Sequence, residues 1–265
     1  MPDWLAIVLL GVIEGVTEFL PVSSTGHLLL AQRWLPQQTD LFNIVIQCGA
    51  VLAVLPLFRK RITSMLSLSA EGRAYAARVA VAFGITAVGG LTLDKLGIGL
   101  PDDILPIAIA LVVGGIAFLV AEQVVDARAA AGRIAASTLT WGVVGSVGAA
   151  QLLAAIFPGT SRSGATIVVM LLLGVSRVAA TEFTFLVGIP TILAAGGYKI
   201  LKALRADGAS GEDWPMVIVG SVVAAIVSFV VVKWLLGYVQ THSFRAFGIY
   251  RIVVGAVLLG LLAFG

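Results

Sequence analysis

The sequence predicts an all-α integral membrane protein with an inverted-topology repeat, in which each half forms a re-entrant helical hairpin and three transmembrane helices. Three observations carry this prediction: the apolar composition, the length of the apolar runs and a match between the two halves. Of the 265 residues, 59% are hydrophobic and only 12% are charged, well beyond an ordinary soluble domain. The formal net charge is +3 and no long Lys/Arg block occurs, so we expect no nucleic-acid partner.

Apolar runs recur along the chain, and several approach the ~20 residues that a helix needs to cross a ~30 Å hydrocarbon core. They cover residues 41–58, 74–93, 104–121, 141–157, 165–175, 183–198, 214–236 and 247–264. Porin strands would alternate between apolar and polar residues, and these runs do not. A shorter apolar stretch comes first, at 4–13, without the basic start or small-residue cleavage site of a secretory signal. We therefore expect it to belong to the mature membrane domain.

The two halves of the chain match when the sequence is compared with itself. The stretch EGVTEFLPVSSTGH, which begins at Glu14, aligns with QLLAAIFPGTSRSG, which begins at Gln151, at an offset of 137 residues. Pro21 then lies opposite Pro158, and the apolar runs that follow correspond in order. The chain is therefore predicted to be one polytopic domain, with one repeat at about 1–125 and the other at about 137–265.

Each repeat begins with an apolar element that is broken at its proline by a polar loop. The apolar pieces after the breaks, 27–35 and 165–175, are too short to span, which favours re-entrant hairpins. Non-helical backbone at membrane depth must be buried in protein or line a wet cavity, so we expect the two loops to face each other. A hairpin and three spans give an odd number of crossings, so the second half enters from the opposite side.

Basic residues set the predicted orientation by the positive-inside rule. The loops assigned to the cytoplasm hold most of them: Arg59, Lys60, Arg61, Arg73, Arg78, Arg128, Arg133, Arg177, Lys233 and Arg245. Both termini are then expected on the outer side. The cluster Lys199, Lys202 and Arg205 lies on that outer side and breaks the rule.

Glu14, Glu18 and Arg162 are charged residues at predicted membrane depth. A charge at mid-membrane costs about 2.5 to 3.5 kcal/mol on translocon-based scales, so function is the default explanation for them. Glu14 and Glu18 are four apart, on one face of a helix. A divalent cation, Mg²⁺ or Ca²⁺, or an arginine would relieve the repulsion between two such carboxylates. An ordinary pair on a solvated helix end is the alternative, and the apolar flanks argue against it.

Both polar loops lead into short helices, so each places a helix N-terminus at membrane depth. Free N–H groups and hydroxyl donors make such a terminus an anion site, and Arg162 adds a fork suited to phosphate. Plain N-capping is the alternative for either loop taken alone. The predicted substrate-binding residues are Ser23, Thr25, Thr160, Ser161, Ser163 and Gly164.

His27 follows Ser24 by three residues, one helical turn away. This spacing could bring imidazole and hydroxyl together as base and nucleophile. We therefore take Ser24, His27, Glu18 and Arg162 as the candidate catalytic residues. Whether Ser24, His27 or water is the nucleophile stays open, as does the metal that is used.

These residues resemble a known family, the undecaprenyl-diphosphate phosphatases of the bacitracin-resistance type. The resemblance covers essentially the whole chain and rests on the motifs EGVTEFLPVSSTGH and PGTSRSG. It implies that Glu14, Glu18, Ser24, His27 and Arg162 form the site, with a divalent cation and a polyprenyl diphosphate substrate. It also implies a multi-pass protein of the bacterial inner membrane, surrounded by membrane lipids, with an active site that faces outside. A homodimer is a possible assembly of such a protein.

The resemblance implies hydrolysis of undecaprenyl diphosphate to the monophosphate and inorganic phosphate, which recycles the cell-envelope carrier lipid. A secondary transporter or lipid flippase is the alternative, because inverted repeats with broken helices are a transporter architecture. A second alternative is the acid-phosphatase type of lipid phosphatase. Members of that type carry a histidine six residues after the arginine, where this chain has Val168.

Overall fold

The computed structural model of the chain describes residues 2–67, 69–98, 103–205 and 212–264. Within these ranges the chain is helical and contains no strand. The elements are α1 (Asp3–Thr17), α2 (Ser24–Ala31), α3 (Asp40–Val54), the 3-10 helix η1 (Leu55–Phe58), α4 (Arg59–Leu66), α5 (Ala70–Leu96), α6 (Ile104–Ala130), α7 (Trp141–Ile156), α8 (Arg162–Leu172), α9 (Arg177–Arg205), α10 (Trp214–Thr241) and α11 (Arg245–Phe264).

Local sequence signals explain where the long helices begin. Side chains of Thr39, Ser69, Thr140 and Asp213 each accept a hydrogen bond from the backbone N–H three residues later, as N-caps do. At its other end α5 stops at Gly97, whose φ of 65° lies in the left-handed region. These caps fix the ends of the helices that surround the site.

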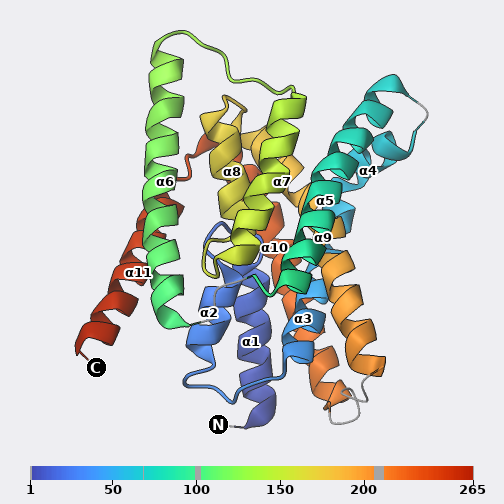
Figure 1. Cartoon of the computed structure of the whole chain (residues 1–265), viewed down its shortest axis with the longest axis vertical. Coiled ribbons are helices and arrows are strands. Elements are labelled where there is room, and N and C mark those ends of the chain that lie inside the picture. Colours follow the sequence, from blue (N-terminus) through green and yellow to red (C-terminus); the bar gives the residue numbers. More distant parts are fainter. Residues whose placement is uncertain (1, 68, 99–102, 206–211, 265) are drawn as a thin grey trace.

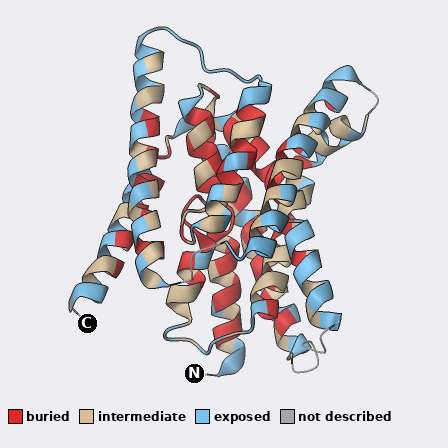
Figure 2. Cartoon of the chain, viewed as in Figure 1, coloured by how far each residue is buried: buried red, intermediate tan, exposed pale blue. Residues whose placement is uncertain are grey.

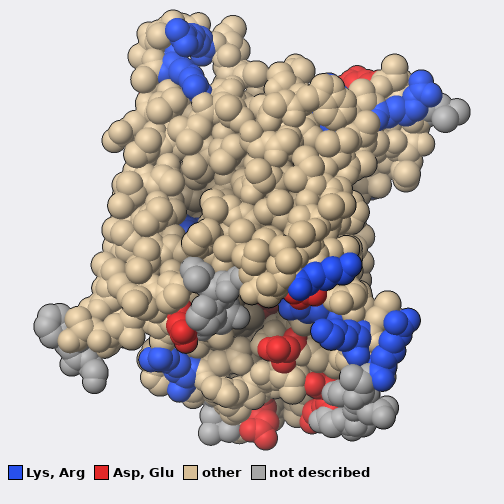
Figure 3. Space-filling view, in the orientation of Figure 1, with Lys and Arg blue, Asp and Glu red and all other residues tan. Residues whose placement is uncertain are grey.

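Six helical segments are long and apolar enough to cross a membrane, which confirms a multi-pass, all-α membrane protein. They are Asp40–Leu66, Ala70–Leu96, Ile104–Ala130, Arg177–Arg205, Trp214–Thr241 and Arg245–Ala263. Figure 2 shows buried residues along the middle of the bundle and exposed ones on its flanks. Many of the exposed residues are large and apolar, such as Ile226 and Val113. On the face seen in Figure 3, charged side chains gather at the two ends and the broad band between them is almost uncharged.

The remaining helices form two hairpins that enter from opposite ends of the bundle (Figure 1). The helix α1 rises from the lower edge and α2 returns to it, whereas α7 descends from the upper edge and α8 returns there. The helices α7 and α8 have 16 and 11 residues and are shorter than the six spans. The opposite directions are what an inverted repeat requires; the repeat and its limits near 125 and 137 stay predictions.

The hairpin turns share an uncommon backbone conformation. Ser23 and Ser161, which precede α2 and α8, have φ of 76° and 66°, a region that residues other than glycine seldom adopt. Each hydroxyl accepts a hydrogen bond from the backbone N–H of the glycine three residues later, Gly26 or Gly164. The aligned serines of the two halves thus make the same cap, which starts each short helix at the loop.

The helices pack in pairs that place these turns at the centre. The helix α1 lies against α10, α7 against α5, and α6 against α11, while α3 lies between α10 and α9. Close approach depends on small residues: a methyl group at Gly15 of α1 would lie 2.7 Å from the Val227 Cβ of α10. Such small-residue contacts are typical of helix packing within membranes.

Arg251 of α11 connects both turns to the surrounding helices. It is fully buried, and its guanidinium donates to the backbone oxygens of Pro21 at 3.1 Å, Gly159 at 3.2 Å and Thr160 at 3.0 Å. It also donates to the oxygen of Ala110 in α6 at 3.0 Å. Carbonyls of broken helices at membrane depth need donors from the protein, because the hydrocarbon supplies none. Arg251 therefore holds the two turns in one arrangement.

Arg251→Met should lower stability by roughly 3 kcal/mol or more, since it leaves several buried carbonyls without a donor. The stability of Arg251→Lys should lie between those of the wild type and Arg251→Met. An ammonium group can donate to a carbonyl but cannot reach several separate carbonyls as a guanidinium does. The measurement is the thermal unfolding midpoint of the purified protein in detergent. Arg245→Met is the matched control: that arginine is half exposed and pairs with Asp126, so its loss should cost about 1 kcal/mol at most. Equal midpoints for Arg251→Met and Arg245→Met would contradict this role.

Candidate active site

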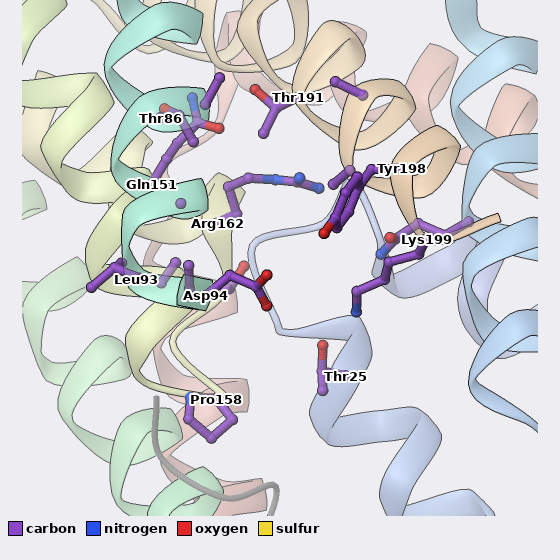
Figure 4. Close-up of a pocket in the computed structure, with 18 of the residues that line it drawn as sticks. Thr25, Thr86, Leu93, Asp94, Gln151, Pro158, Arg162, Thr191, Tyr198 and Lys199 are labelled. Carbon is purple, nitrogen blue, oxygen red and sulfur yellow. The ribbon is translucent and has the colours of Figure 1, made fainter. Parts of the chain in front are cut away.

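The two turns border a cavity of about 660 Å³. Its walls come from the end of α1, the start of α2 and of α8, and from α3, α5, α7 and α9. Figure 4 shows Arg162 reaching across the cavity, with Thr86, Gln151 and Thr191 on one side and Asp94, Lys199 and Thr25 on the other. The cavity therefore joins residues of both halves of the chain.

Glu18 is the centre of the polar contacts in this cavity. Its Oε1 accepts a hydrogen bond from Arg162 Nη2 at 2.5 Å. Its Oε2 accepts from the hydroxyl of Ser24 at 2.6 Å and from the amide of Gln47 at 2.9 Å. Glu18 is only 8% exposed, so these partners replace the water that a carboxylate requires. Arg162 thus compensates the charge of Glu18 but makes no hydrogen bond to Glu14. The divalent cation expected at the glutamate pair stays a prediction.

Glu14 lies one turn before Glu18 and is fully buried. Neither of its carboxylate oxygens has a hydrogen-bond partner among the described residues, and it does not line the cavity. An unpartnered buried carboxyl is costly and calls for an explanation such as an ion. Together with Glu18 it offers oxygen donors of the kind that Mg²⁺ and Ca²⁺ take. Within the described ranges no three His, Cys, Asp or Glu side chains gather as a metal-binding group.

The structure does not pair His27 with Ser24 as the spacing suggested. His27 Nδ1 lies 2.7 Å from the backbone oxygen of Ser23, and Nε2 lies 2.7 Å from the hydroxyl of Tyr250 in α11. A carbonyl only accepts, so Nδ1 carries the proton and Nε2 accepts from Tyr250. The imidazole also stacks on the Tyr250 ring. The Ser24 hydroxyl instead donates to Glu18, so the base nearest to it is Glu18.

The predicted substrate-binding residues separate into two groups. Ser23, Thr25 and Ser161 line the cavity. Thr160, Ser163 and Gly164 do not appear in its wall and instead fix the second turn. The hydroxyl of Ser163 donates to the backbone oxygen of Leu20 at 3.3 Å, which joins the second turn to the first.

Sequence reasoning missed Arg251 and Tyr250. A signal for Arg251 existed, since it is a charged residue inside the apolar run 247–264 and the membrane cost applied to Arg162 applies to it equally. Nothing in the sequence singles out Tyr250. Lys199, which breaks the positive-inside rule, lines the cavity beside Tyr198.

Comparison with known proteins agrees with these motifs. The family model described as "Bacitracin resistance protein BacA" matches residues 7–257. An undecaprenyl-diphosphatase of Rhizobium etli is 52% identical over 266 residues, covering 99% of this chain and 98% of the relative. An undecaprenyl-diphosphatase of Xanthomonas oryzae pv. oryzae is 49% identical over 263 residues, covering 98% of this chain and 97% of the relative. With its two turns, its central carboxylate and these relatives, the chain belongs to the bacitracin resistance protein BacA family.

Proposed function

We propose that the chain hydrolyses undecaprenyl diphosphate to the monophosphate and inorganic phosphate, and so recycles the carrier lipid of cell-envelope synthesis. The observation that carries this proposal is the meeting of the Ser24 hydroxyl, the Glu18 carboxylate and the Arg162 guanidinium in one cavity. The full-length relatives named undecaprenyl-diphosphatase support it. Transport alone would need neither a hydroxyl poised on a carboxylate nor an arginine beside it, so hydrolysis is favoured over a transporter or flippase.

Phosphoryl transfer depends chiefly on positioning and charge stabilisation. Arg162 takes phosphate oxygens with its planar fork, and the backbone N–H groups that begin α2 and α8 point to the same anion. In its present position Arg162 pairs with Glu18. A bound diphosphate competes for that guanidinium and releases the carboxylate to accept a proton.

Ser24 is the nucleophile in this proposal and Glu18 is its base. The Ser24 oxygen bonds to the terminal phosphorus as its proton passes to Glu18, and the bond from that phosphorus to the bridging oxygen breaks. The lipid monophosphate leaves with the bonding electrons. As it departs, the monophosphate takes the proton from Glu18, which is then ionised again. Water attacks the phosphoserine and gives a proton to Glu18. Glu18 passes that proton to the Ser24 oxygen as its bond to phosphorus breaks, which leaves orthophosphate and the free Ser24 hydroxyl. His27 is a positioning residue, because its Nδ1–H holds the carbonyl of Ser23, the residue that directs Ser24 towards Glu18.

Glu14 and Glu18 would hold a divalent cation, Mg²⁺ or Ca²⁺. Two carboxylates leave most coordination positions for water and phosphate oxygens, an arrangement usual for Mg²⁺. The unpartnered oxygens of Glu14 support this assignment. When bound, the cation neutralises part of the charge of the diphosphate. The site faces the outer side of the bacterial inner membrane in this proposal, and a homodimer stays a prediction.

Ser24→Ala and Glu18→Gln should each lower kcat roughly a thousandfold or more, and the double variant should be little worse, because the two residues act as one unit. His27→Ala should lose only about tenfold, the value of one positioning hydrogen bond. The assay measures phosphate released from undecaprenyl diphosphate, with Ser146→Ala as the control: Ser146 only bonds its own helix. Substantial turnover by Ser24→Ala, without phosphoserine in acid-quenched wild type, would remove Ser24 as the nucleophile.

Glu14→Gln should weaken activity mainly by lowering metal affinity, so excess Mg²⁺ or Ca²⁺ should restore part of it. A chelator should abolish wild-type turnover, and the titration midpoint for the cation should rise at least about tenfold in the variant. Glu71→Gln, at the exposed start of α5, should keep the wild-type titration. The same metal dependence in Glu14→Gln as in wild type would contradict the assignment of Glu14 as a ligand.

The orientation can be tested with single cysteines in a Cys48→Ala background, which lacks the chain's one native cysteine. Gln37→Cys lies in the loop between α2 and α3, and Glu71→Cys lies at the opposite end of the bundle, at the start of α5. A membrane-impermeant thiol reagent added to intact spheroplasts should label only Gln37→Cys, and both should react after permeabilisation. Asp102, in the sequence between α5 and α6, is a further position for such a cysteine and lies outside the described residues. The reverse labelling pattern would place the site on the cytoplasmic side.

A further inference from the structure

Gln151 of α7 is a buried amide with no partner. It is 2% exposed, it lines the cavity, and neither its oxygen nor its nitrogen has a hydrogen-bond partner among the described residues. Among the described residues, only Glu14 also has buried side-chain polar atoms without a hydrogen-bond partner. Glu14 and Gln151 are aligned when the two halves of the sequence are compared. An unsatisfied buried amide destabilises a fold, so a ligand that completes its hydrogen bonds is the natural explanation.

Two threonine hydroxyls line the same end of the cavity. Figure 4 shows Thr86 of α5 close to Gln151, with Thr191 of α9 across from them. Thr86 donates its hydrogen to the Ala82 carbonyl at 3.0 Å, and Thr191 donates to the Val187 carbonyl at 2.8 Å. Each hydroxyl therefore has only lone pairs left for the cavity. This end thus combines two N–H donors of one amide with acceptor oxygens and contains no charge of its own.

The position of this end relative to the reactive residues is set by helix geometry. Thr86 precedes Asp94 by eight residues on α5, and Thr191 precedes Lys199 by eight on α9, so each pair is about 12 Å apart along its helix. Arg162 lies between the two levels in Figure 4. The neutral end with Gln151, Thr86 and Thr191 therefore lies on one side of Arg162, and Asp94 and Lys199 lie on the other side.

We propose that Gln151, Thr86 and Thr191 form a subsite for the orthophosphate that leaves the reaction. This inference rests on the proposed function. Orthophosphate at neutral pH carries both P–O⁻ acceptors, which the Gln151 amide can bind, and P–OH donors, which the threonine oxygens can accept. A phosphate attached to a carbon chain has a second pKa of about 6 and is mostly without a P–OH at neutral pH, so it suits the subsite less well. Arg162 borders the subsite and supplies the positive charge that pairs with the orthophosphate anion.

The test measures inorganic phosphate on the purified full-length protein in two ways, as a product inhibitor and as a stabilising ligand. Gln151→Met should raise the inhibition constant for phosphate about tenfold, the value of one hydrogen bond to a charged group. The KM for the lipid should change less than about twofold. Without phosphate, the variant should unfold at the wild-type temperature or above it, because an unsatisfied amide has been replaced by an apolar side chain. At a phosphate concentration equal to the wild-type inhibition constant, the stabilisation by phosphate should be several-fold smaller in the variant than in the wild type.

Gln240→Met is the matched control, since Gln240 is exposed near the end of α10 and bonds only the Leu236 carbonyl. It should keep the wild-type inhibition constant. Thr191→Val removes one acceptor and should raise the constant about threefold, so a second variant tests the subsite should Gln151→Met not fold.

An unchanged inhibition constant in both pocket variants would overturn the proposal, and so would a raised KM with an unchanged inhibition constant, which would assign the amide to the substrate. Failure of the proposed function has a different signature. The wild type would then release no phosphate from the lipid, while added phosphate would still stabilise it more than it stabilises Gln151→Met.

Discussion

The structure depends on how two interrupted helices are satisfied at membrane depth. Each interruption exposes carbonyls and N–H groups where the bilayer has no water to bind them. Two capping serines, Ser23 and Ser161, satisfy part of the N–H side, and the Arg251 guanidinium satisfies carbonyls of both turns at once. Because one side chain bonds both turns, neither can move without loss to the other. The alignment of the site across the two halves follows from that shared donor.

The same interruption places charge where it can act. A helix that begins inside the protein presents its first backbone N–H groups there, where they can bind an anion. Glu18 and Arg162 come from opposite halves and meet at these ends, so each neutralises the other while the site holds no substrate. An anionic group that takes the arginine leaves the carboxylate without its guanidinium partner. In the proposed mechanism, the pair thereby links phosphate binding to the release of a base next to Ser24.

Sequence reasoning reached the helical membrane fold, the six spanning segments and the two broken elements because hydrophobic length and proline act locally. It also brought Glu18 and Arg162 to the same place, since burying either charge alone is costly. It misjudged the hydrogen-bond partner of His27, because a three-residue spacing shows which groups a side chain can reach and not which one it bonds. The winning partners are the Ser23 carbonyl and Tyr250, and Tyr250 comes from a helix 223 residues away. Long-range competition of this kind leaves no local pattern in the chain.

The predicted repeat gives two aligned positions of the sequence different chemistry. Glu14 and Gln151 occupy aligned places in α1 and α7, both buried and both without a protein partner. A carboxylate left in this way attracts a cation, whereas an amide carries no charge and can donate to an anion. Substituting oxygen for nitrogen at one of two equivalent positions is therefore enough to make the site unsymmetrical.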